Sequence, residues 1–290
     1  MSLNDATLAF IGSGVMGEAM IRGVLHRELV PRTSIVAADP HAERITYLHD
    51  TFGVEVTHSN RDAARTADIV ILSIKPQVMS AVLPELDGQL KPDALVISIA
   101  AGVPLHTLSH GLSNQHVVRA MPNTPGQIGK GITVWTATRD VSGSQRQQAK
   151  ELLGALGEVM YVEDERFLDM ATALNGTGPA YVFMFMEALI DVGVHMGLSR
   201  RDAERLVLHT MRGSVEFAMQ SNQHPAELRN QVTSPGGTSA EAIYHLEKGG
   251  LRTVIADGVW AAYRRSRELG SHRPSRDGRI VWFVKMWTKS

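Results

Sequence analysis

The first of two glycine-rich turns that could bind anions lies near the start of the chain. Its residues, Gly12, Ser13, Gly14, Val15, Met16 and Gly17, fit the pattern G-x-G-x-x-G. The turn follows an apolar run typical of a buried strand and precedes a helix-like pattern, the context in which such a loop binds the pyrophosphate of a dinucleotide. Gly12 would make the tight turn, Gly14 would let the phosphates approach the backbone, and Gly17 would let helix and strand pack closely. We expect dinucleotide binding here, rather than a turn that binds nothing.

The second turn lies in the stretch from Val232 to Lys248. Its core reads Ser-Pro-Gly-Gly-Thr-Ser, residues 234–239, and it opens directly into a helix-like run. The first N–H groups of a helix have no partners inside the helix and attract anions. The sequence therefore predicts a second anion site that also offers hydroxyl groups.

An acidic residue, Asp39, follows the second apolar run at about 20 residues beyond the last glycine of the loop, where a carboxylate can accept the hydroxyls of the adenosine ribose. Such a carboxylate favours NADH because it repels a 2′-phosphate. His41 and Arg44 lie just beyond Asp39 and could offset that repulsion. A solvated aspartate at a strand end is the alternative interpretation. The pattern thus leaves the choice between NADPH and NADH open.

Composition excludes several other kinds of site. The chain of 290 residues has no cysteine and a formal net charge of −1, so we expect no thiolate chemistry and no general attraction to nucleic acid. His106 and His110 have helical metal-ligand spacing but no third ligand, and we expect no metal site. The N-terminus does not resemble a signal peptide, and we expect no apolar run of membrane-spanning length, hence a cytoplasmic protein without membrane contact.

The elements that must position these turns differ between the two parts of the chain. Short runs rich in valine and isoleucine, at 6–12, 34–39, 68–74 and 94–100, alternate with helical patterns at 14–26 and 41–51. This alternation predicts an α/β fold, with a Rossmann-type parallel sheet covered by helices in the N-terminal part. We place this dinucleotide-binding domain at residues 1–165.

From residue 166 to 270 we expect an all-helical domain, followed by a C-terminal tail, 271–290, of unknown role. The segment 179–196 is apolar on nearly every face, and such a helix has to be surrounded by protein. Ser199 with Asp202 is typical of a helix start, and Pro225 suits the first turn of another helix. The surrounding protein is either the rest of the domain or a second copy of the chain.

Several motifs together closely resemble the pyrroline-5-carboxylate reductase family. They are Ile74-Lys75-Pro76-Gln77, Ala100-Ala101-Gly102-Val103, the RAMPNTPG segment at 119–126, the NGTGPAYVFMFMEAL segment at 175–189 and the second glycine-rich turn. The prolines of 119–126 predict a rigid loop without regular structure. The resemblance extends to about residue 269.

This resemblance implies a Rossmann domain, a helical domain that intertwines with a partner subunit, and dimers or rings of dimers. The reaction it implies is reduction of L-1-pyrroline-5-carboxylate to L-proline with NADPH or NADH, the last step of proline synthesis. The cofactor contacts that it implies are Gly12, Ser13, Gly14, Val15, Met16, Gly17, Asn60, Ile74, Lys75, Pro76 and Ala101. For the substrate it implies Glu165, Ser234, Gly236, Gly237, Thr238 and Ser239.

The chain departs from the family pattern at two places. Asn175 and Thr177 occupy positions where the family usually has serine, and Ser239 replaces a usual threonine. Our hypothesis is that backbone N–H groups around Gly237, Thr238 and Ser239 bind the substrate carboxylate. The Ser239 hydroxyl, with Thr238, would then hydrogen-bond the ring nitrogen and act as the catalytic contact.

Three alternatives compete with this interpretation. A β-hydroxyacid dehydrogenase-like enzyme would need a catalytic lysine on the long helix, and Val182 to Met196 contains none. Another imine reductase would share the glycine loop. A non-catalytic NAD(P)-binding protein would have no use for the second turn.

Overall fold

The computed structural model describes residues 2–270, and the chain divides into two compact units that are each described by themselves. The first unit runs to Gly176 and includes the chain again from Ala262, whereas the second is Thr177–Ala261. The tail predicted at 271–290 lies outside the described residues. The predicted domain limits at 165 and 270 stay predictions.

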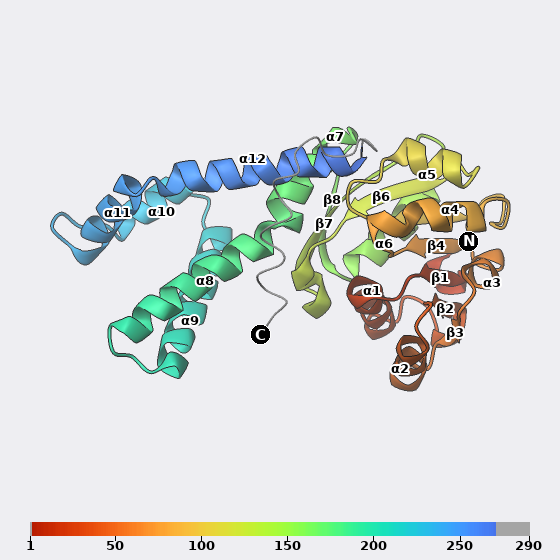
Figure 1. Ribbon diagram of the computed structural model, residues 1–290, viewed down its shortest axis with the longest axis horizontal. Coiled ribbons are helices and arrows are strands. Elements are labelled where there is room, and N and C mark those ends of the chain that lie inside the picture. Colours follow the sequence, from red (N-terminus) through yellow and green to blue (C-terminus); the bar gives the residue numbers. More distant parts are fainter. Residues whose placement is uncertain (1, 271–290) are drawn as a thin grey trace. The chain divides into compact units, whose positions relative to one another are not determined.

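The first unit is built on an eight-stranded sheet with the order β3-β2-β1-β4-β5-β6-β7-β8 (Figure 1). Its strands are β1 (Leu8–Ile11), β2 (Ile35–Ala38), β3 (Glu55–Thr57), β4 (Ile69–Leu72), β5 (Leu95–Ser98), β6 (Val117–Met121), β7 (Gly131–Ala137) and β8 (Gly157–Tyr161). β1, β4 and β5 are buried along their whole length, as expected for strands covered on both faces. The four strands predicted from apolar runs are confirmed.

The prediction of a parallel sheet needs one correction, because β7 pairs antiparallel with β6 while every other neighbouring pair is parallel. The rigid loop predicted at 119–126 is also wrong in part. Arg119 to Met121 complete β6, and Thr124–Ile128 form a 3-10 helix. A proline interrupts a central strand only at its own position, and Pro122 and Pro125 both come after Met121, the last residue of β6.

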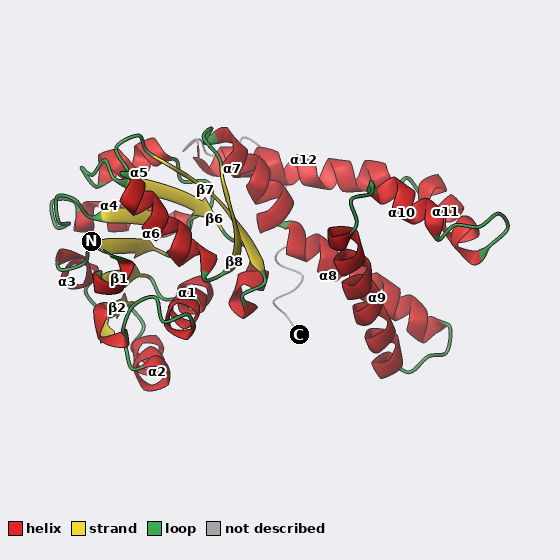
Figure 2. Cartoon of the chain, turned by 180° about the vertical axis from the view of Figure 1, so that it is seen from behind, coloured by secondary structure: helices red, strands yellow, loops and turns green. Residues whose placement is uncertain are grey.

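Six helices cover the two faces of this sheet (Figure 2). α1 (Val15–His26), α2 (Ala42–Phe52) and α6 (Gly143–Gly154) pack on one face, around a core that includes Phe10 and Ile71. α3 (Asn60–Arg65), α4 (Met79–Leu86) and α5 (Leu105–Gly111) pack on the other, around Ile11 and Val70. The doubly wound arrangement that the alternating pattern predicts is therefore present.

After β8 the described chain is entirely helical. α7 (Arg166–Ala171) continues through a π-helical turn, Thr172–Gly176, and the second unit then holds α8 (Gly178–His195), α9 (Arg200–Gln220), α10 (Pro225–Gln231), α11 (Thr238–Lys248) and most of α12 (Leu251–Gly270). The Ser199 side chain accepts a hydrogen bond from the Asp202 N–H at 3.1 Å, so the predicted helix start is confirmed. Pro225 opens α10, also as predicted.

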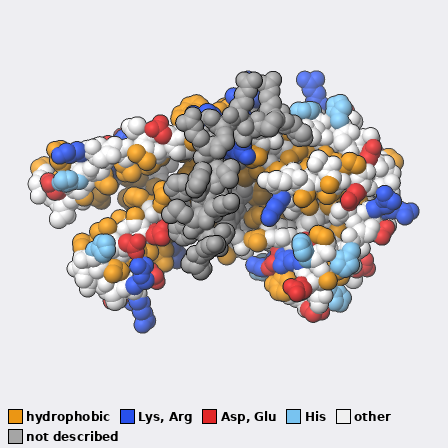
Figure 3. All heavy atoms as spheres, viewed as in Figure 1, with side chains coloured by type: hydrophobic (Ala, Val, Ile, Leu, Met, Phe, Trp, Pro, Cys, Tyr) orange, Lys and Arg blue, Asp and Glu red, His pale blue; other side chains and the backbone are white. Residues whose placement is uncertain are grey.

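The second unit has almost no core of its own. Ala203 is the single apolar side chain of 177–261 that is buried, and it packs against Gly193 where α9 meets α8. Large apolar side chains on α8, α9, α11 and α12 are exposed, and Figure 3 shows apolar atoms on the outside of these helices. They include Phe183, Met184, Leu206, Phe217, Tyr244, Ile255 and Trp260. Exposed apolar surface of this kind marks a contact with another protein surface.

Asp68 joins three segments at the amino-terminal edge of the sheet. Its carboxylate accepts hydrogen bonds from the Thr7 N–H at 2.9 Å, the Thr7 hydroxyl at 2.7 Å and Lys91 Nζ at 2.6 Å. Burial would raise the pKa of this carboxyl, but the hydrogen bonds from Lys91 and Thr7 outweigh it, so the pKa lies below its ordinary value of 3.8. The ionised form therefore stabilises the folded chain at neutral pH.

We expect Asp68→Asn to lower the free energy of unfolding at pH 7 by about 1–2 kcal/mol, because the three hydrogen bonds to the carboxylate lose its charge or their acceptor. As the pH falls below 3.8, Asp68 of wild type is protonated in the unfolded chain before it is protonated in the folded chain. The difference in free energy of unfolding between wild type and Asp68→Asn should therefore shrink. Urea unfolding followed by circular dichroism at pH 7 and at about pH 3.5 measures both values. Asp50→Asn, at an exposed position on α2, is the control and should stay within about 0.5 kcal/mol of wild type. A deficit that is the same at both pH values would contradict the assignment.

Candidate active site

The predicted cofactor residues of the first unit gather at the carboxyl-terminal edge of the sheet. β1, β2, β4 and β5 run parallel and end side by side, and the glycine loop, Asp39, Ile74-Lys75-Pro76 and Ala101 directly follow them. Asn60 begins α3 just after β3. Ligands of open parallel sheets bind at this edge, where the strand order reverses beside β1.

The three glycines of the loop have different surroundings. Gly12 has a φ of +79°, and a Cβ there would lie 2.4 Å from Cγ2 of Ile74. A Cβ on Gly17 would lie 2.9 Å from both the Gly12 carbonyl oxygen and Ser73 Oγ, whereas a Cβ on Gly14 would meet no atom within 4 Å. Gly12 and Gly17 are thus required by the fold itself, and Gly14 leaves space above the backbone for a ligand.

The N-terminus of α1 supplies the donors for that ligand. Gly14 is its N-cap, and no side chain of the described chain caps the first turn. Its free N–H groups and the positive end of the helix dipole are directed to the open side of the loop. These residues fit the pyrophosphate of a dinucleotide.

Asp39 contacts the loop rather than open solvent. Its Oδ2 accepts the Ser13 N–H at 3.1 Å. Its Oδ1 lies 3.1 Å from the backbone nitrogen of His41 and 2.9 Å from the ring nitrogen Nδ1 of the same residue. Burial would raise the pKa of the Asp39 carboxyl, but the hydrogen bonds from Ser13 and His41 outweigh it and lower the pKa. The carboxyl is therefore ionised and already has three donors.

Arg44 holds the same loop from the α2 side, a role that the sequence pattern did not predict. Its Nε donates to the Ser13 carbonyl at 2.5 Å, and its Nη2 donates to the Gly14 carbonyl at 3.3 Å and to Glu18 Oε2 at 2.6 Å. Ser73, after β4, donates to the Gly12 carbonyl. One sequence signal could have indicated this role. Two residues of opposite charge, Glu18 and Arg44, lie in the first turns of α1 and α2.

Two other predicted residues are already engaged with protein atoms. Asn60 donates from Nδ2 to Glu85 on α4 at 2.9 Å. Glu165, predicted to lie near the substrate, accepts from the Leu105 N–H at 2.7 Å and from Arg119 Nη1 at 2.8 Å. Arg119 is only 4% exposed and also donates to Asp169, which accepts from Ser266. This buried ion-pair cluster was not predicted.

Asn175, one of the departures noted in the sequence, lies in the π-helical turn. Its Nδ2 donates to the carbonyl of Met121 at 3.3 Å and to that of Ile132 at 3.1 Å. It therefore joins the end of β6 to β7. A serine hydroxyl has one proton and could not donate to both carbonyls.

The second glycine-rich turn lies in the other unit, and its internal geometry is well defined. The Ser234 carbonyl accepts the Gly237 N–H at 3.0 Å, and Gly236 has a φ of +73°, which together with Pro235 is the pattern of a type II turn. Gly237 is the N-cap of α11, without a side-chain cap. Ser234 thus already accepts the Gly237 N–H, and binding of a carboxylate by the N–H groups around Gly237, Thr238 and Ser239 stays a prediction. The donors that remain are those of the first turn of α11, beginning with Thr238 and Ser239.

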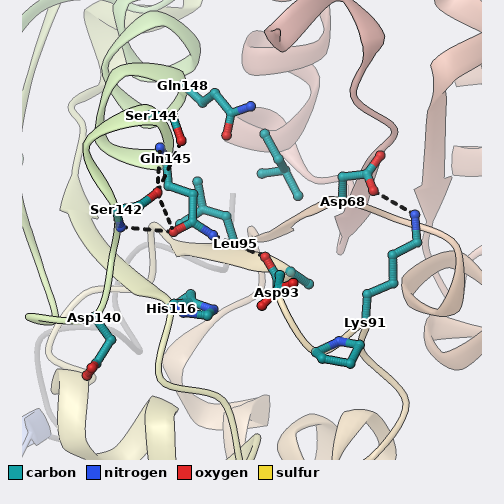
Figure 4. A pocket seen from close by; sticks show the side chains of 13 residues that line it. Asp68, Lys91, Asp93, Leu95, His116, Asp140, Ser142, Ser144, Gln145 and Gln148 are labelled. Atoms are coloured by element: carbon teal, nitrogen blue, oxygen red, sulfur yellow. Dashed lines mark hydrogen bonds and ion pairs between the residues drawn. The ribbon is translucent and has the colours of Figure 1, made fainter. Parts of the chain in front are cut away.

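A separate hollow of about 630 Å³ lies at the opposite, amino-terminal edge of the sheet (Figure 4). Asp68, Lys91, His116 and the first turn of α6 line it. The Lys91–Asp68 ion pair and the Ser142–Gln145 capping box engage four of its polar side chains. Because the glycine loop follows the other ends of these strands, this hollow is not the cofactor site.

Comparison with known proteins agrees with the two-part architecture. Residues 165–269 match the family model described as pyrroline-5-carboxylate reductase dimerisation, and residues 7–102 match that described as NADP oxidoreductase coenzyme F420-dependent. A pyrroline-5-carboxylate reductase of Pseudomonas aeruginosa is 43% identical to this chain over 92% of it and 98% of the relative. The chain belongs to the pyrroline-5-carboxylate reductase family. A family member from Synechocystis is 41% identical over 91% of this chain and 98% of its own.

Solved structures of this reductase family have the same fold. A Plasmodium falciparum pyrroline carboxylate reductase, solved with NADP bound, has a TM-score of 0.86 and 31% identity, covering 93% of this chain and 100% of its own. A Coxiella burnetii pyrroline-5-carboxylate reductase has a TM-score of 0.83 and 35% identity, covering 92% and 99%.

One expectation about membranes needs correction. The continuous helical stretch Arg166–His195 is long and apolar enough to cross a membrane, judged by length and composition alone. We expected no such run from the sequence, and Glu187 and Asp191 do interrupt the apolar residues of this stretch. Most of this stretch is the exposed helix α8, inside the segment that matches the reductase dimerisation model. A homo-oligomer contact accounts for its apolar faces.

Gly14→Ala tests the cofactor loop without disturbing the fold. Gly14 has a φ of −64°, which alanine also adopts, and the added methyl group meets no protein atom. We expect the melting temperature to stay within about 2 °C, whereas the affinity for NADPH should fall roughly tenfold or more because the methyl group occupies the place of a phosphate. Fluorescence titration of NADPH and thermal unfolding measure the two effects. Gly143→Ala, at the start of α6 with the same open surroundings, is the control and should change neither. Undiminished NADPH affinity in Gly14→Ala would place the phosphates elsewhere.

Proposed function

We propose that this chain catalyses the reduction of L-1-pyrroline-5-carboxylate to L-proline by hydride transfer from NADPH or NADH, the final step of proline biosynthesis. The observation that carries this proposal is family membership across nearly the whole chain. The glycine loop at the carboxyl edge of the sheet supports it, since it has the space and the donors that a dinucleotide needs.

In this proposal the first unit binds the cofactor, which supplies the hydride when bound. The loop Gly12–Gly17 and the first turn of α1 hold the pyrophosphate. Asn60, Lys75, Pro76 and Ala101 line the same edge of the sheet, and Ile74 packs behind Gly12. Asp39 holds the Ser13 N–H and so keeps the loop in its binding conformation.

The turn 234–239 binds the substrate. The type II turn made by Ser234, Gly236 and Gly237 presents the open N-terminus of α11, whose first N–H groups bind the carboxylate. The Ser239 hydroxyl, with that of Thr238, bonds the ring nitrogen, so that the imine carbon keeps one face toward the hydride. The nitrogen of the protonated imine retains its proton when the carbon accepts the hydride, which gives the secondary amine of proline. Glu165, a further predicted substrate contact, is held by Arg119.

The same proposal covers partners and location. The chain is a homo-oligomer, and we propose that its unit is a dimer or a ring of dimers, because the second unit leaves the apolar faces of its helices unburied. We propose a small-molecule substrate, no nucleic-acid partner, no membrane contact and a cytoplasmic location. The net charge of −1 supports the absence of a general attraction to nucleic acid.

Competing reactions are less well supported. A β-hydroxyacid dehydrogenase mechanism needs a lysine on the long helix, and α8 has none. A non-catalytic NAD(P)-binding protein gives no reason for an uncapped helix N-terminus with hydroxyl residues in its first turn.

Oxidation of NADPH and of NADH with pyrroline-5-carboxylate, followed at 340 nm, tests the reaction. For Ser239→Ala we expect kcat/KM to fall about tenfold or more, because a hydrogen bond to a charged group is lost. Ser239→Thr keeps the hydroxyl and restores the residue usual in the family, so its kcat/KM should equal or exceed that of wild type. Absence of turnover with both cofactors would refute the reaction, and unchanged kinetics of Ser239→Ala would refute the role of Ser239.

A further inference from the structure

The residue that ordinarily decides between NADH and NADPH is already occupied in this chain. A carboxylate at the end of the second strand usually accepts the ribose hydroxyls and repels a 2′-phosphate. The Asp39 side chain is only 10% exposed, and its two oxygens accept the Ser13 N–H and lie beside the backbone and ring nitrogens of His41. Its negative charge is therefore directed into the protein.

Two basic side chains are more accessible than Asp39 at the same place. The His41 side chain is 81% exposed, and that of Arg44 is 24% exposed. Arg44 uses Nε and Nη2 for the loop carbonyls and Glu18, and no bond to its Nη1 occurs within residues 2–270. The guanidinium group also lies over the Tyr47 ring, with 5.2 Å from Cζ to the ring centroid, so its orientation is held from two sides.

The acidic groups that contact His41 and Arg44 are both paired, whereas Glu43, between them in the sequence, is exposed and has no ion pair within residues 2–270. Glu18 binds both Arg22 and Arg44, and Asp39 pairs with His41. His58, after β3, has its Nδ1 3.2 Å from the Asp39 carbonyl oxygen and adds no negative charge. An incoming phosphate would thus meet cationic and N–H groups with their negative partners already satisfied.

From this geometry we propose that His41 and Arg44 bind the 2′-phosphate of NADPH, and that Asp39 is a positioning residue that fixes His41 and the glycine loop. The inference rests on the proposed dinucleotide binding and adds a preference to it. NADPH is bound more tightly than NADH, and NADH is still accepted because the loop and helix α1 contact only what both cofactors share. Arg44 gives a guanidinium–phosphate contact, the geometry for which arginine is best suited.

The test uses two fragments of the cofactor that lack the nicotinamide and differ only in the 2′-phosphate. Calorimetric titration of the full-length protein with 2′,5′-ADP and with 5′-AMP gives the ratio of their dissociation constants, which isolates the phosphate. We expect wild type to bind 2′,5′-ADP at least about tenfold more tightly. In Arg44→Gln that ratio should fall to about one, and in His41→Ala it should fall several-fold while 5′-AMP affinity stays within roughly threefold. Arg65→Gln, an exposed position in the last turn of α3, removes the same charge at the other edge of the sheet and should leave the ratio unchanged.

A ratio near one in wild type would overturn the inference. So would an Arg44→Gln variant that weakens both nucleotides equally, since Arg44 would then only hold the loop. If Arg44→Gln bound neither nucleotide, His41→Ala decides, because the His41 side chain bonds only Asp39 within residues 2–270. A reduced ratio supports the inference and an unchanged one refutes it. The proposed reaction can fail separately. If wild type binds 2′,5′-ADP more tightly than 5′-AMP but does not reduce pyrroline-5-carboxylate, the proposed reaction is refuted and this inference is not.

Discussion

The hydrogen bonds around the Ser13–Gly14 backbone are the constraint on which the cofactor half of the molecule depends. Asp39 accepts the Ser13 N–H, Arg44 donates to both carbonyls, and Ser73 secures the carbonyl of Gly12. Donors and acceptors from β2, α2 and the end of β4 thus converge on one turn. A loop fixed in this way loses little conformational entropy when a ligand binds, so more of the contact energy contributes to affinity. The open space at Gly14 then becomes a shaped site.

Much of this arrangement could be predicted because it follows from local rules. Strands buried on both faces read as continuous apolar runs, and G-x-G-x-x-G between such a run and a helical pattern has few other uses. Ser199 with Asp202, and Pro225, mark helix starts by chemistry confined to a few neighbouring residues. The second glycine-rich turn was predicted in the same way, from proline and glycine beside hydroxyls.

The features that could not be predicted involve residues far apart in the sequence. The antiparallel placement of β7 depends on pairing with β6, which the composition of either segment does not specify. Arg119 lies in an apolar strand and becomes buried only because Glu165 and Asp169, on a later helix, neutralise it. The bond from the Gly237 N–H to Ser234 is local, but it depends on the turn type, and residue types alone did not reveal which donors remain free. Asp39 is masked by the Ser13 N–H, 26 residues earlier in the chain, as well as by the neighbouring His41.

The helical unit buries Ala203 and almost no other apolar side chain within its own chain. Its folding is therefore a matter of mass action between chains. The sheet unit has its own core and can form on a single chain as it leaves the ribosome, but the helices that follow reach their final packing only after chains associate. The catalytic capacity of this protein thus depends on its concentration as well as on its sequence, and a cell that makes too little of it loses order in the helical unit before it loses the sheet.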